Sequence, residues 1–349
     1  MKKILDLGFG RETLRDLCNS GQSSSRLLYG MAEISHRGNY IVIECSMSSH
    51  SGLKGLLKNN MMSLKKADII FMSYIYESSL ILICLLKALG LFKQKKIVGV
   101  CHTTVNQGRN LLDRIVKKLV FNSFDKVLFH SYVNMEESLS LKTINRSQAE
   151  FLYWGDDLSY VDKAFPIRSH GDFFVSTGRE NRDYSLLINA FIDLPLKLEI
   201  YTNRFNFDNN YDYLDNYRSK FKNIDIFMVD RSNETTLHLL ERVAACRCVL
   251  VPLIQSKVNY CLGLTSIVEA MALGKPIISS VNPYSPVDIE KEEIGFVVRN
   301  VVEWKSALQF ISENPDEAEK MGMRARSLAE KKFNIEKCSQ QIESVFSSL

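Results

Sequence analysis

The stretch GLTSIVEAMALGKPIIS, residues 263–279, has the pattern from which the fold of this chain can be predicted. Apolar residues recur in it at helical spacing, namely Ile267, Val268, Met271 and Ala272. They predict a helix with one apolar face. Gly274 and the following Lys275-Pro276 end this helix, because proline cannot continue it. Apolar runs at 248–253 and 276–278 predict buried strands on either side, so the segment is strand, loop, helix, strand, the unit of a parallel sheet.

The start of this helix is suited to binding an anion. Gly263, Thr265 and Ser266 are of the residue types found at helix starts, where backbone amides are left accessible. The helix dipole favours negative charge at the same end. Glu269 follows within the first turn or so, and its carboxylate would repel phosphate, so we expect it to hold hydroxyls such as those of a ribose. An ordinary capped core helix with one solvated glutamate fits the same periodicity.

With its spacing taken into account, the segment 263–278 resembles the nucleotide-sugar signature of GT-B glycosyltransferases, and is most like glycosyltransferase family 4. The shared form is Gly-x-Thr-x-x-x-Glu-Ala-Met-Ala-x-Gly-x-Pro-Ile-Ile. The resemblance implies an α/β fold of two Rossmann-like domains facing across a cleft. It also implies that Glu269 binds the donor ribose and that amides near Thr265 and Ser266 face the diphosphate. Many family members carry another glutamate eight positions before Glu269, where this chain has Cys261.

Two arginines follow the strand expected at 173–176. Gly178-Arg179 matches the Gly-Arg of the resembling donor domains, and Arg182 replaces their usual lysine. Two cations at a strand end can neutralise a diphosphate, and arginine binds phosphate oxygens with bidentate geometry. A solvated basic loop is the alternative. The donor residues implied in this way, including those of the loop that would hold the base, are Gly178, Arg179, Arg182, Asp230, Arg231, Gly263, Thr265, Ser266 and Glu269.

The first half of the chain alternates expected strands and helices, the rhythm of a Rossmann-like domain. His102 and His130 each follow an expected strand directly. Ligands of open parallel sheets bind beyond the carboxyl ends of the strands, so both histidines are candidates for a cleft. The resemblance implies that His102 faces the donor sugar, whereas a histidine bonded locally in its loop is the alternative. We expect His130 on the acceptor side. Gly21 and Gln22 lie in a small-residue loop that we also expect on the acceptor side, or else as a flexible capped loop.

Length and composition limit the remaining possibilities. The 349 residues carry a formal net charge of +4, which is too weak to indicate nucleic-acid binding. The eight cysteines form no CxxC pair and no cluster with zinc spacing, so we expect reduced thiols and a cytosolic setting. The start of the chain lacks the apolar core of a signal peptide. We expect an acceptor domain at 1–166, a linker at 167–171, a donor domain at 172–330, and a helix at 331–349 that crosses back to the first domain.

The resulting functional prediction is transfer of a hexosyl group from a nucleotide diphosphate sugar to an acceptor hydroxyl. Arg179, Arg182 and the helix start would take up charge growing on the leaving diphosphate, while His102 orients the sugar. The resemblance favours a reaction that retains the anomeric configuration and requires no metal ion, and it implies no cofactor. Two alternatives stay open: a nucleotide-sugar 2-epimerase, which releases an altered sugar without an acceptor, and a non-catalytic subunit of a transferase complex, which the Cys261 departure allows.

A membrane surface is the last partner that the sequence suggests. The segment SSLILICLLKALGLF, residues 78–92, is shorter than the roughly 20 residues of a spanning helix and contains Lys87. Six basic residues flank it or lie on a nearby expected helix: Lys93, Lys95, Lys96, Arg114, Lys117 and Lys118. Such a cluster suits an anionic interface. We therefore expect a cytoplasmic enzyme, peripheral on the inner face of the cell membrane, that glycosylates a lipid-linked glycan in bacterial surface-polysaccharide assembly. A core helix followed by a solvated lysine turn is the alternative.

Overall fold

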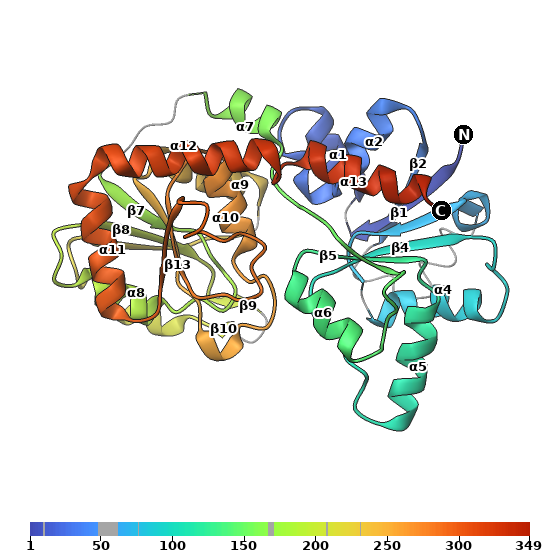
Figure 1. Cartoon of the computed structure of the whole chain (residues 1–349). Coiled ribbons are helices and arrows are strands. Elements are labelled where there is room, and N and C mark those ends of the chain that lie inside the picture. The colour runs from blue at the N-terminus through green and yellow to red at the C-terminus, as the bar shows by residue number, and fades with distance from the viewer. Residues whose placement is uncertain (10, 48–61, 76, 167–170, 207–208, 231) are drawn as a thin grey trace. The chain divides into compact units, whose positions relative to one another are not determined.

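The computed structural model describes residues 1–9, 11–47, 62–75, 77–166, 171–206, 209–230 and 232–349. They form two compact units, Met1–Trp154 with Ile335–Leu349, and Gly155–Asn334. Each unit has a six-stranded parallel sheet with helices against it, which confirms the predicted fold class of two Rossmann-like domains (Figure 1). The division lies between Trp154 and Gly155, whereas we expected the first domain to reach residue 166. Residues 167–170 of the expected linker lie outside the described residues.

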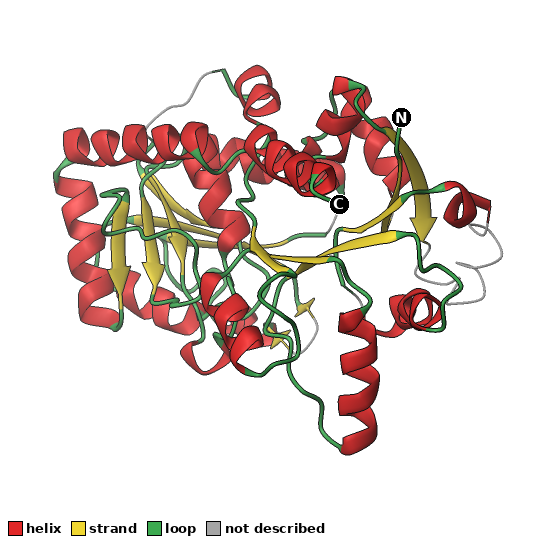
Figure 2. Cartoon of the chain, turned by 45° about the vertical axis from the view of Figure 1, so that its right-hand side comes forward, coloured by secondary structure: helices red, strands yellow, loops and turns green. Residues whose placement is uncertain are grey.

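The sheet of the first unit has the strand order β2-β1-β3-β4-β5-β6, and all its pairs are parallel. Its strands are β1 (Lys3–Phe9), β2 (Ile41–Met47), β3 (Ile69–Met72), β4 (Lys96–Cys101), β5 (Lys126–Phe129) and β6 (Ala149–Phe151). Its helices are α1 (Arg11–Asn19), η1 (Ser25–Leu28), α2 (Met31–Arg37), α4 (Glu77–Ala88), α5 (Leu111–Asn122), α6 (Tyr132–Ser140) and α13 (Ile335–Ser347). The strands lie as one layer among the helices (Figure 2).

The C-terminal helix α13 is held to the first unit by ionic and packing contacts. Arg37, at the end of α2, pairs with Glu336 and Glu343 of α13, at 2.8 Å each. Gly30 comes so close to α13 that a Cβ on it would stand 2.7 Å from Ser339 Cα. Only glycine therefore fits at position 30, where φ is also +78°. The last helix of the chain thus belongs to the first unit, although it is far in sequence from the rest of that unit.

The apolar segment 78–92 forms a core helix. Ile83 and Cys84 of α4 are fully buried in the core of the first unit, whereas Leu89 and Leu91 after its end are 78% and 69% exposed. In the described part of the chain, no helix is long and apolar enough to cross a membrane. The segment itself is therefore explained by packing, as one of the two interpretations of the sequence proposed.

The basic residues after α4, which we expected to face an anionic membrane surface, make contacts within the first unit. Lys95 Nζ donates to the carbonyl oxygens of Lys65 (2.9 Å) and Ala67, and burial lowers the pKa of Lys95. Lys96 Nζ lies 3.1 Å from the carboxylate of Asp125, which also accepts from Lys87 Nζ at 2.5 Å. The amines of Lys95 and Lys96 are therefore bonded to groups of the first unit, although the Lys96 side chain is still 41% exposed, and Lys93 is exposed.

The sheet of the second unit has the order β11-β8-β7-β12-β13-β14, again parallel throughout. Its strands are β7 (Phe173–Ser176), β8 (Lys197–Thr202), β11 (Ile224–Met228), β12 (Cys248–Val251), β13 (Ile277–Ser280) and β14 (Gly295–Val298), with a small hairpin of β9 (Phe205–Asn206) and β10 (Asn209–Asn210). Its helices are α7 (Leu158–Ala164), α8 (Tyr184–Phe191), η2 (Asp212–Asn216), α9 (Asn233–Ala245), η3 (Gln255–Lys257), α10 (Leu264–Ala272), α11 (Val301–Glu313) and α12 (Pro315–Lys331).

This strand order has a functional consequence. Chain order runs outward from β7 to β8 and β11 on one side, and from β12 to β13 and β14 on the other. The order therefore reverses between β7 and β12, and ligands of doubly wound sheets bind at such a switch point, beyond the carboxyl ends of the strands. The loops that leave β7 and β12 are the ones that carry Arg182 and Gly263.

The structure also corrects the start of the α10 helix. Gly263 is the N-cap residue with φ +86°, and no side chain caps this end. Thr265 and Ser266 lie inside the first turn instead of capping it, and Glu269 falls in the second turn. Left-handed backbone at the cap favours glycine, which has no Cβ to clash. The helix end therefore keeps its amides for another partner.

Candidate functional site

The loop after β7 buries a cation at the switch point of the second unit. Arg182 is only 5% exposed, and its backbone forms an isolated bridge with Leu253 of the loop after β12. Its backbone N–H donates to the hydroxyl of Tyr211 at 2.9 Å. Asn181, just before it, has φ +50°, so the chain turns sharply to place Arg182 inward. The two loops at the switch point are thus joined around one guanidinium.

The charge of Arg182 is not neutralised within the chain. Its Nη1 donates to the carbonyl oxygen of Glu180 at 2.8 Å, and its Nη2 to the hydroxyl of Ser266 at 3.3 Å. Its Nε has no hydrogen-bond partner, and among the described residues no carboxylate forms an ion pair with the guanidinium. A buried charge without a counter-charge is costly, and a ligand of opposite charge would offset that cost. The site therefore calls for an anion.

Two glycines give the guanidinium its space. A Cβ on Gly178 would stand 2.0 Å from Arg182 Nε, and a Cβ on Gly263 would stand 2.6 Å from Val251 Cγ1 and 3.9 Å from Arg182 Nη2. Neither position accepts a side chain without displacing a neighbour. The hydroxyl of Tyr184 donates to the Gly178 carbonyl oxygen and so fixes the loop after β7. Glycine at 178 follows from the close approach of the backbone to the guanidinium, and glycine at 263 follows from its positive φ and from the Val251 side chain.

The N-terminus of α10 lies against the same guanidinium. Ser266, in the first turn, accepts the Arg182 hydrogen bond and is 4% exposed, whereas Thr265 is exposed. The backbone N–H groups of Thr265 and Ser266 make no hydrogen bond in the described part of the chain. Free amides and the positive end of the dipole favour an anion there. The structure thus brings together Gly178, Arg182 and the helix start that the sequence pointed to.

The remaining donor residues lie around this centre with less direct contacts. Arg179 is half-buried, and its charge contributes to the low pKa of Asp230, about 2, which is set mainly by hydrogen bonds from Thr235 and Ser232. Asp230 therefore stabilises the start of α9. Glu269 is half-buried, one helical turn beyond Thr265. Arg231 lies outside the described residues.

Two tyrosines of this site were not predicted as functional. Tyr184 is fully buried and Tyr211 is 2% exposed, their rings meet edge-to-face at 5.3 Å, and each fixes one strand of the Arg182 loop through its hydroxyl. Tyr184 follows Arg182-Asp183 directly in the sequence, so its nearness to Arg182 could have been noticed there. Tyr211 carries no local signal, because its partner Arg182 is distant in the chain.

In the first unit, the two predicted histidines meet in an aromatic cluster. The imidazole centroids of His102 and His130 are 5.2 Å apart, and Tyr74 stacks on His102 at 4.6 Å. The Tyr29 hydroxyl hydrogen-bonds His102 Nε2 at 2.9 Å, and its ring stacks on those of His130 and Trp154. Both histidines follow their strands as expected, at the carboxyl edge of the sheet.

Each histidine keeps one buried nitrogen for another partner. His130 Nδ1 bonds to the carbonyl oxygen of Leu152 at 3.0 Å, whereas His130 Nε2 and His102 Nδ1 have no hydrogen-bond partner among the described residues. Burial, and secondarily the charge of His130, lowers the pKa of His102 to about 3; burial lowers the pKa of His130 to about 4. Both rings are neutral near pH 7, so they can bind hydroxyls but carry no charge.

The predicted acceptor-side residues Gly21 and Gln22 lie elsewhere in the first unit. Both are exposed in the turn after α1, and Gly21 has φ +71° with nothing within 4 Å of where a Cβ would stand. Glycine is needed there for its left-handed backbone. The acceptor role of these two residues remains a prediction.

The depressed pKa values predict an acid-sensitive fold. Between pH 6.5 and about 4 the unfolded chain protonates His102 and His130, while the folded chain does not. The free energy of unfolding should therefore fall as pH falls, by at most about 1.4 kcal/mol per pH unit for each histidine, and level off above pH 6.5. This slope is measured by urea unfolding at several pH values between 7 and 4.5. The unfolding is followed by a spectroscopic signal that comes from the first unit.

The control replaces the histidines. The slope should shrink in a His102→Gln/His130→Asn variant and stay in His36→Asn, which alters an exposed residue near the end of α2. An equal slope in the double variant would contradict the assignment.

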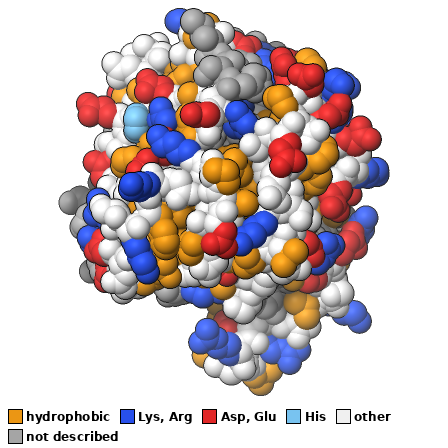
Figure 3. All heavy atoms as spheres, turned by 90° about the vertical axis from the view of Figure 1, so that its left-hand side faces the viewer, with side chains coloured by type: hydrophobic (Ala, Val, Ile, Leu, Met, Phe, Trp, Pro, Cys, Tyr) orange, Lys and Arg blue, Asp and Glu red, His pale blue; other side chains and the backbone are white. Residues whose placement is uncertain are grey.

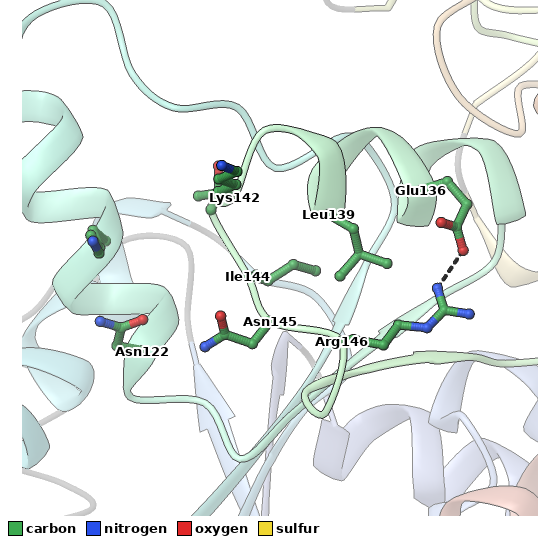
Figure 4. Close-up of a pocket in the computed structure, with 9 residues that line it drawn as sticks. Asn122, Glu136, Leu139, Lys142, Ile144, Asn145 and Arg146 are labelled. Atoms are coloured by element: carbon green, nitrogen blue, oxygen red, sulfur yellow. Dashed lines mark hydrogen bonds and ion pairs between the residues drawn. The ribbon is translucent and has the colours of Figure 1, made fainter.

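A hollow of about 730 Å³ lies in the first unit, away from both clusters. Nine residues of α5, α6 and the segment after α6 line it: Lys118, Asn122, Glu136, Leu139, Lys142, Thr143, Ile144, Asn145 and Arg146 (Figure 4). Its lining includes no histidine and no residue of the second unit. The buried guanidinium of Arg182 and this hollow are therefore separate features, and the residues of the candidate donor motif lie at the former.

Comparison with known proteins supports the fold. No protein-family profile and no curated protein sequence matches the chain. HepE of Anabaena, solved in complex with UDP, matches with a TM-score of 0.66 and 15% identity over 100% of both chains. WaaG, a glycosyltransferase involved in lipopolysaccharide biosynthesis, matches with a TM-score of 0.57 and 12% identity over 98% of this chain and 99% of WaaG. The UDP-GlcNAc 2-epimerase from Neisseria meningitidis, bound to UDP-GlcNAc, matches with a TM-score of 0.60 and 12% identity over 100% of both.

These likenesses define the class of fold. The chain has the GT-B fold of two Rossmann-like domains, which glycosyltransferases and UDP-GlcNAc 2-epimerases share. At such low identity the likeness concerns the fold alone. The more specific resemblance to glycosyltransferase family 4 remains a prediction from the motif at residues 263–278.

Proposed function

We propose that this protein is a glycosyltransferase that moves a hexosyl group from a nucleoside diphosphate sugar to an acceptor hydroxyl. The observation that supports this most is the buried guanidinium of Arg182, without a counter-charge, beside free amides at the start of α10. A diphosphate supplies the missing negative charge and the acceptors for those amides. UDP is the first nucleotide to test, because HepE was solved with UDP.

The chemistry we propose is positioning and charge stabilisation. As the glycosidic bond to the diphosphate breaks, negative charge grows on the leaving group, and Arg182, Arg179 and the α10 amides stabilise it. Donors already in place need no reorganisation at that moment. His102 and His130, neutral near pH 7, would bind sugar hydroxyls through their unpartnered nitrogens. We further propose retention of the anomeric configuration and no requirement for a metal ion or cofactor.

The exposed apolar side chains of the first unit bear on the acceptor. We place the protein in the cytoplasm, at the inner face of the cell membrane, and propose a lipid-linked glycan of surface-polysaccharide assembly as acceptor. What supports this is the set of large apolar side chains that the first unit exposes, Leu89, Leu91, Leu111 and Leu112 among them. A membrane-bound substrate would explain why they face outward.

Product analysis distinguishes this proposal from its rivals. Purified protein is incubated with labelled UDP-glucose or UDP-GlcNAc, with and without a membrane lipid extract, and with and without EDTA. Release of UDP together with label in the lipid fraction supports the transferase. Release of UDP with an altered free sugar in the absence of acceptor indicates a 2-epimerase. This alternative is included because the chain is similar in fold to the UDP-GlcNAc 2-epimerase from Neisseria meningitidis. UDP binding without turnover of any donor would favour a non-catalytic subunit.

Glu269 offers a test of the ribose assignment. Glu269→Gln preserves shape but replaces an acceptor oxygen by a donor, so we expect UDP to bind several-fold more weakly. The penalty should be smaller for dUDP, which lacks one ribose hydroxyl. Calorimetric titration of both nucleotides measures the difference, and the assignment fails if the variant discriminates UDP from dUDP as the wild type does.

A further inference from the structure

The two acidic residues closest to Arg182 in the chain have carboxylates that are bonded elsewhere. Asp183 caps α8, where its carboxylate accepts a hydrogen bond from the Leu186 N–H at 3.0 Å. Glu180 gives Arg182 its backbone carbonyl oxygen, which accepts from Nη1 at 2.8 Å. Among the described residues, neither carboxylate forms an ion pair with the guanidinium. Two carboxylates that are near in sequence are thus not used to neutralise this charge.

The carboxylate of Glu180 is held by Tyr260, in the loop after β12. The Tyr260 hydroxyl hydrogen-bonds this carboxylate, and burial, followed by the charge of Glu180, raises the pKa of Tyr260. The hydroxyl therefore stays protonated and donates the hydrogen bond. The charge of Arg182 acts on the same hydroxyl in the opposite direction, so the guanidinium lies within electrostatic reach of this pair.

Backbone hydrogen bonds fix the two loops that carry this pair. Asn282 Nδ2 donates to the carbonyl oxygen of Tyr260 at 3.1 Å. The N–H of Ile254 donates to the carbonyl oxygen of Asn181 at 3.0 Å, which ties the loop after β12 to the loop after β7. Glu180 and Tyr260 are both half-buried. Because the backbone is held on both sides, the place of the Glu180 carboxylate depends on the Tyr260 hydroxyl.

Other cations of the second unit pair with carboxylates. On the face of the chain shown in Figure 3, acidic and basic side chains lie interspersed. Lys305 of α11 pairs with Asp193 at 2.8 Å, and Arg242 pairs with the buried Glu199 at 2.7 Å. Arg182 differs from both, because the carboxylate two residues before it is bonded to a tyrosine. This arrangement suits a cation whose anion arrives with the ligand.

We propose that Tyr260 is a positioning residue that keeps the Glu180 carboxylate off the Arg182 guanidinium, so that Arg182 retains its charge for the diphosphate. The inference rests on the proposed function, which identifies the anion as a nucleoside diphosphate. Without the Tyr260 hydroxyl, the carboxylate would pair with Arg182, and the diphosphate would have to displace it. Apparent affinity then falls in proportion to the fraction of molecules in which the guanidinium is unpaired.

Titration with UDP, which carries no sugar, measures this competition. Tyr260→Phe should weaken UDP binding about tenfold, the ratio that a single charge-assisted hydrogen bond supplies. Adding Glu180→Gln should restore the affinity to within about threefold of the wild type, because the amide carries no charge. A purely structural role of Tyr260 would not be rescued by a change at Glu180.

Tyr201→Phe is the matched control. The Tyr201 hydroxyl also donates to a carboxylate of the second unit, that of Glu199, at 3.1 Å. Glu199 is already paired with Arg242, so loss of this hydroxyl releases no carboxylate toward Arg182. UDP binding should therefore be unchanged in this variant.

A measurement without ligand separates this inference from the proposed function. In the wild-type background, Arg182→Met should keep or raise the melting temperature, because the buried guanidinium has no carboxylate partner among the described residues. In the Tyr260→Phe background the same substitution should lower it, since the guanidinium there has gained Glu180. If UDP does not bind the wild type, the proposed donor site fails, and this change of sign still decides the role of Tyr260.

The inference is overturned by any of three results. These are wild-type UDP affinity in Tyr260→Phe, a weakened affinity that Glu180→Gln does not restore, and an effect of Arg182→Met on the melting temperature that has the same sign in both backgrounds.

Discussion

Replacing Arg182 by methionine should weaken UDP binding about 10- to 100-fold and leave the protein as stable as the wild type, or more so. The affinity falls because charge-assisted contacts to the diphosphate, about 1.5–3 kcal/mol each, are lost. The stability is kept because the guanidinium is buried without a carboxylate, and methionine fills much the same volume without a charge to desolvate. Calorimetric titration with UDP and a melting curve without ligand measure the two effects.

A matched arginine in the same unit serves as the control. Arg242 forms a bidentate pair with Glu199, at 2.9 and 2.7 Å, and Glu199 is 3% exposed. Arg242→Met leaves that carboxylate buried with the Tyr201 hydroxyl at 3.1 Å and, as its remaining cation among the described residues, the more distant Lys197 at 3.6 Å. It should therefore lower the melting temperature and spare UDP binding. The opposite signs test the assignment: if Arg182→Met destabilised the fold and left UDP affinity intact, Arg182 would be a structural residue.

Among changes that add a single methyl group near the boundary between the two units, Gly155→Ala should be the most destabilising. A Cβ on Gly155 would stand 1.8 Å from the carbonyl oxygen of Phe333, next to the points where the chain enters and leaves the second unit. Asp156 and Asn334 form a parallel bridge next to this contact. Because the clash is with backbone, relief requires the two segments to separate, at about 3 kcal/mol or more. Scanning calorimetry should show the melting temperature lowered by roughly 5–10 °C.

Gly38→Ala isolates the cost of glycine conformation alone. Gly38 has φ +72° and nothing within 4 Å of where a Cβ would stand, so the substitution meets backbone strain without a clash. We expect about 1 kcal/mol there. Equal melting temperatures for the two variants would mean that the chain at Gly155 relaxes freely, and the close approach of the two crossing segments would then carry no constraint.

The strands of the fold were largely predictable, and the reason is physical. Runs such as Phe173–Ser176 and Ile69–Met72 are buried on both faces, so they are continuously apolar and stand out in sequence. The edge strands β6 and β14 and the polar helix α1 escaped prediction. β6 is three half-buried residues, and α1 is a charged surface helix, so neither carries the apolar periodicity on which the prediction depends.

The donor motif was also predictable, because its residues come from short segments with strong local requirements. Glycine at 178 and 263, arginine at 182 and a small residue at 266 each answer a constraint within one loop or helix end. What these residues do to one another was not predictable. Ser266 was expected as a helix cap, but in the structure it accepts a hydrogen bond from Arg182, a residue 84 positions away in the chain.

By itself, therefore, the sequence determined the two parallel sheets, the start of the helix after Gly263 and the placement of Arg182 after a strand, since all of these follow from local periodicity and backbone requirements. Only the tertiary structure decided that Arg182 is buried without a carboxylate partner among the described residues, and that the amines of Lys95 and Lys96 bond to groups of the first unit. It also decided that Leu111 and Leu112 of α5 are exposed. The physical reason is that burial and charge pairing depend on neighbours brought together from distant parts of the chain, whereas propensity and spacing depend only on residues close in sequence.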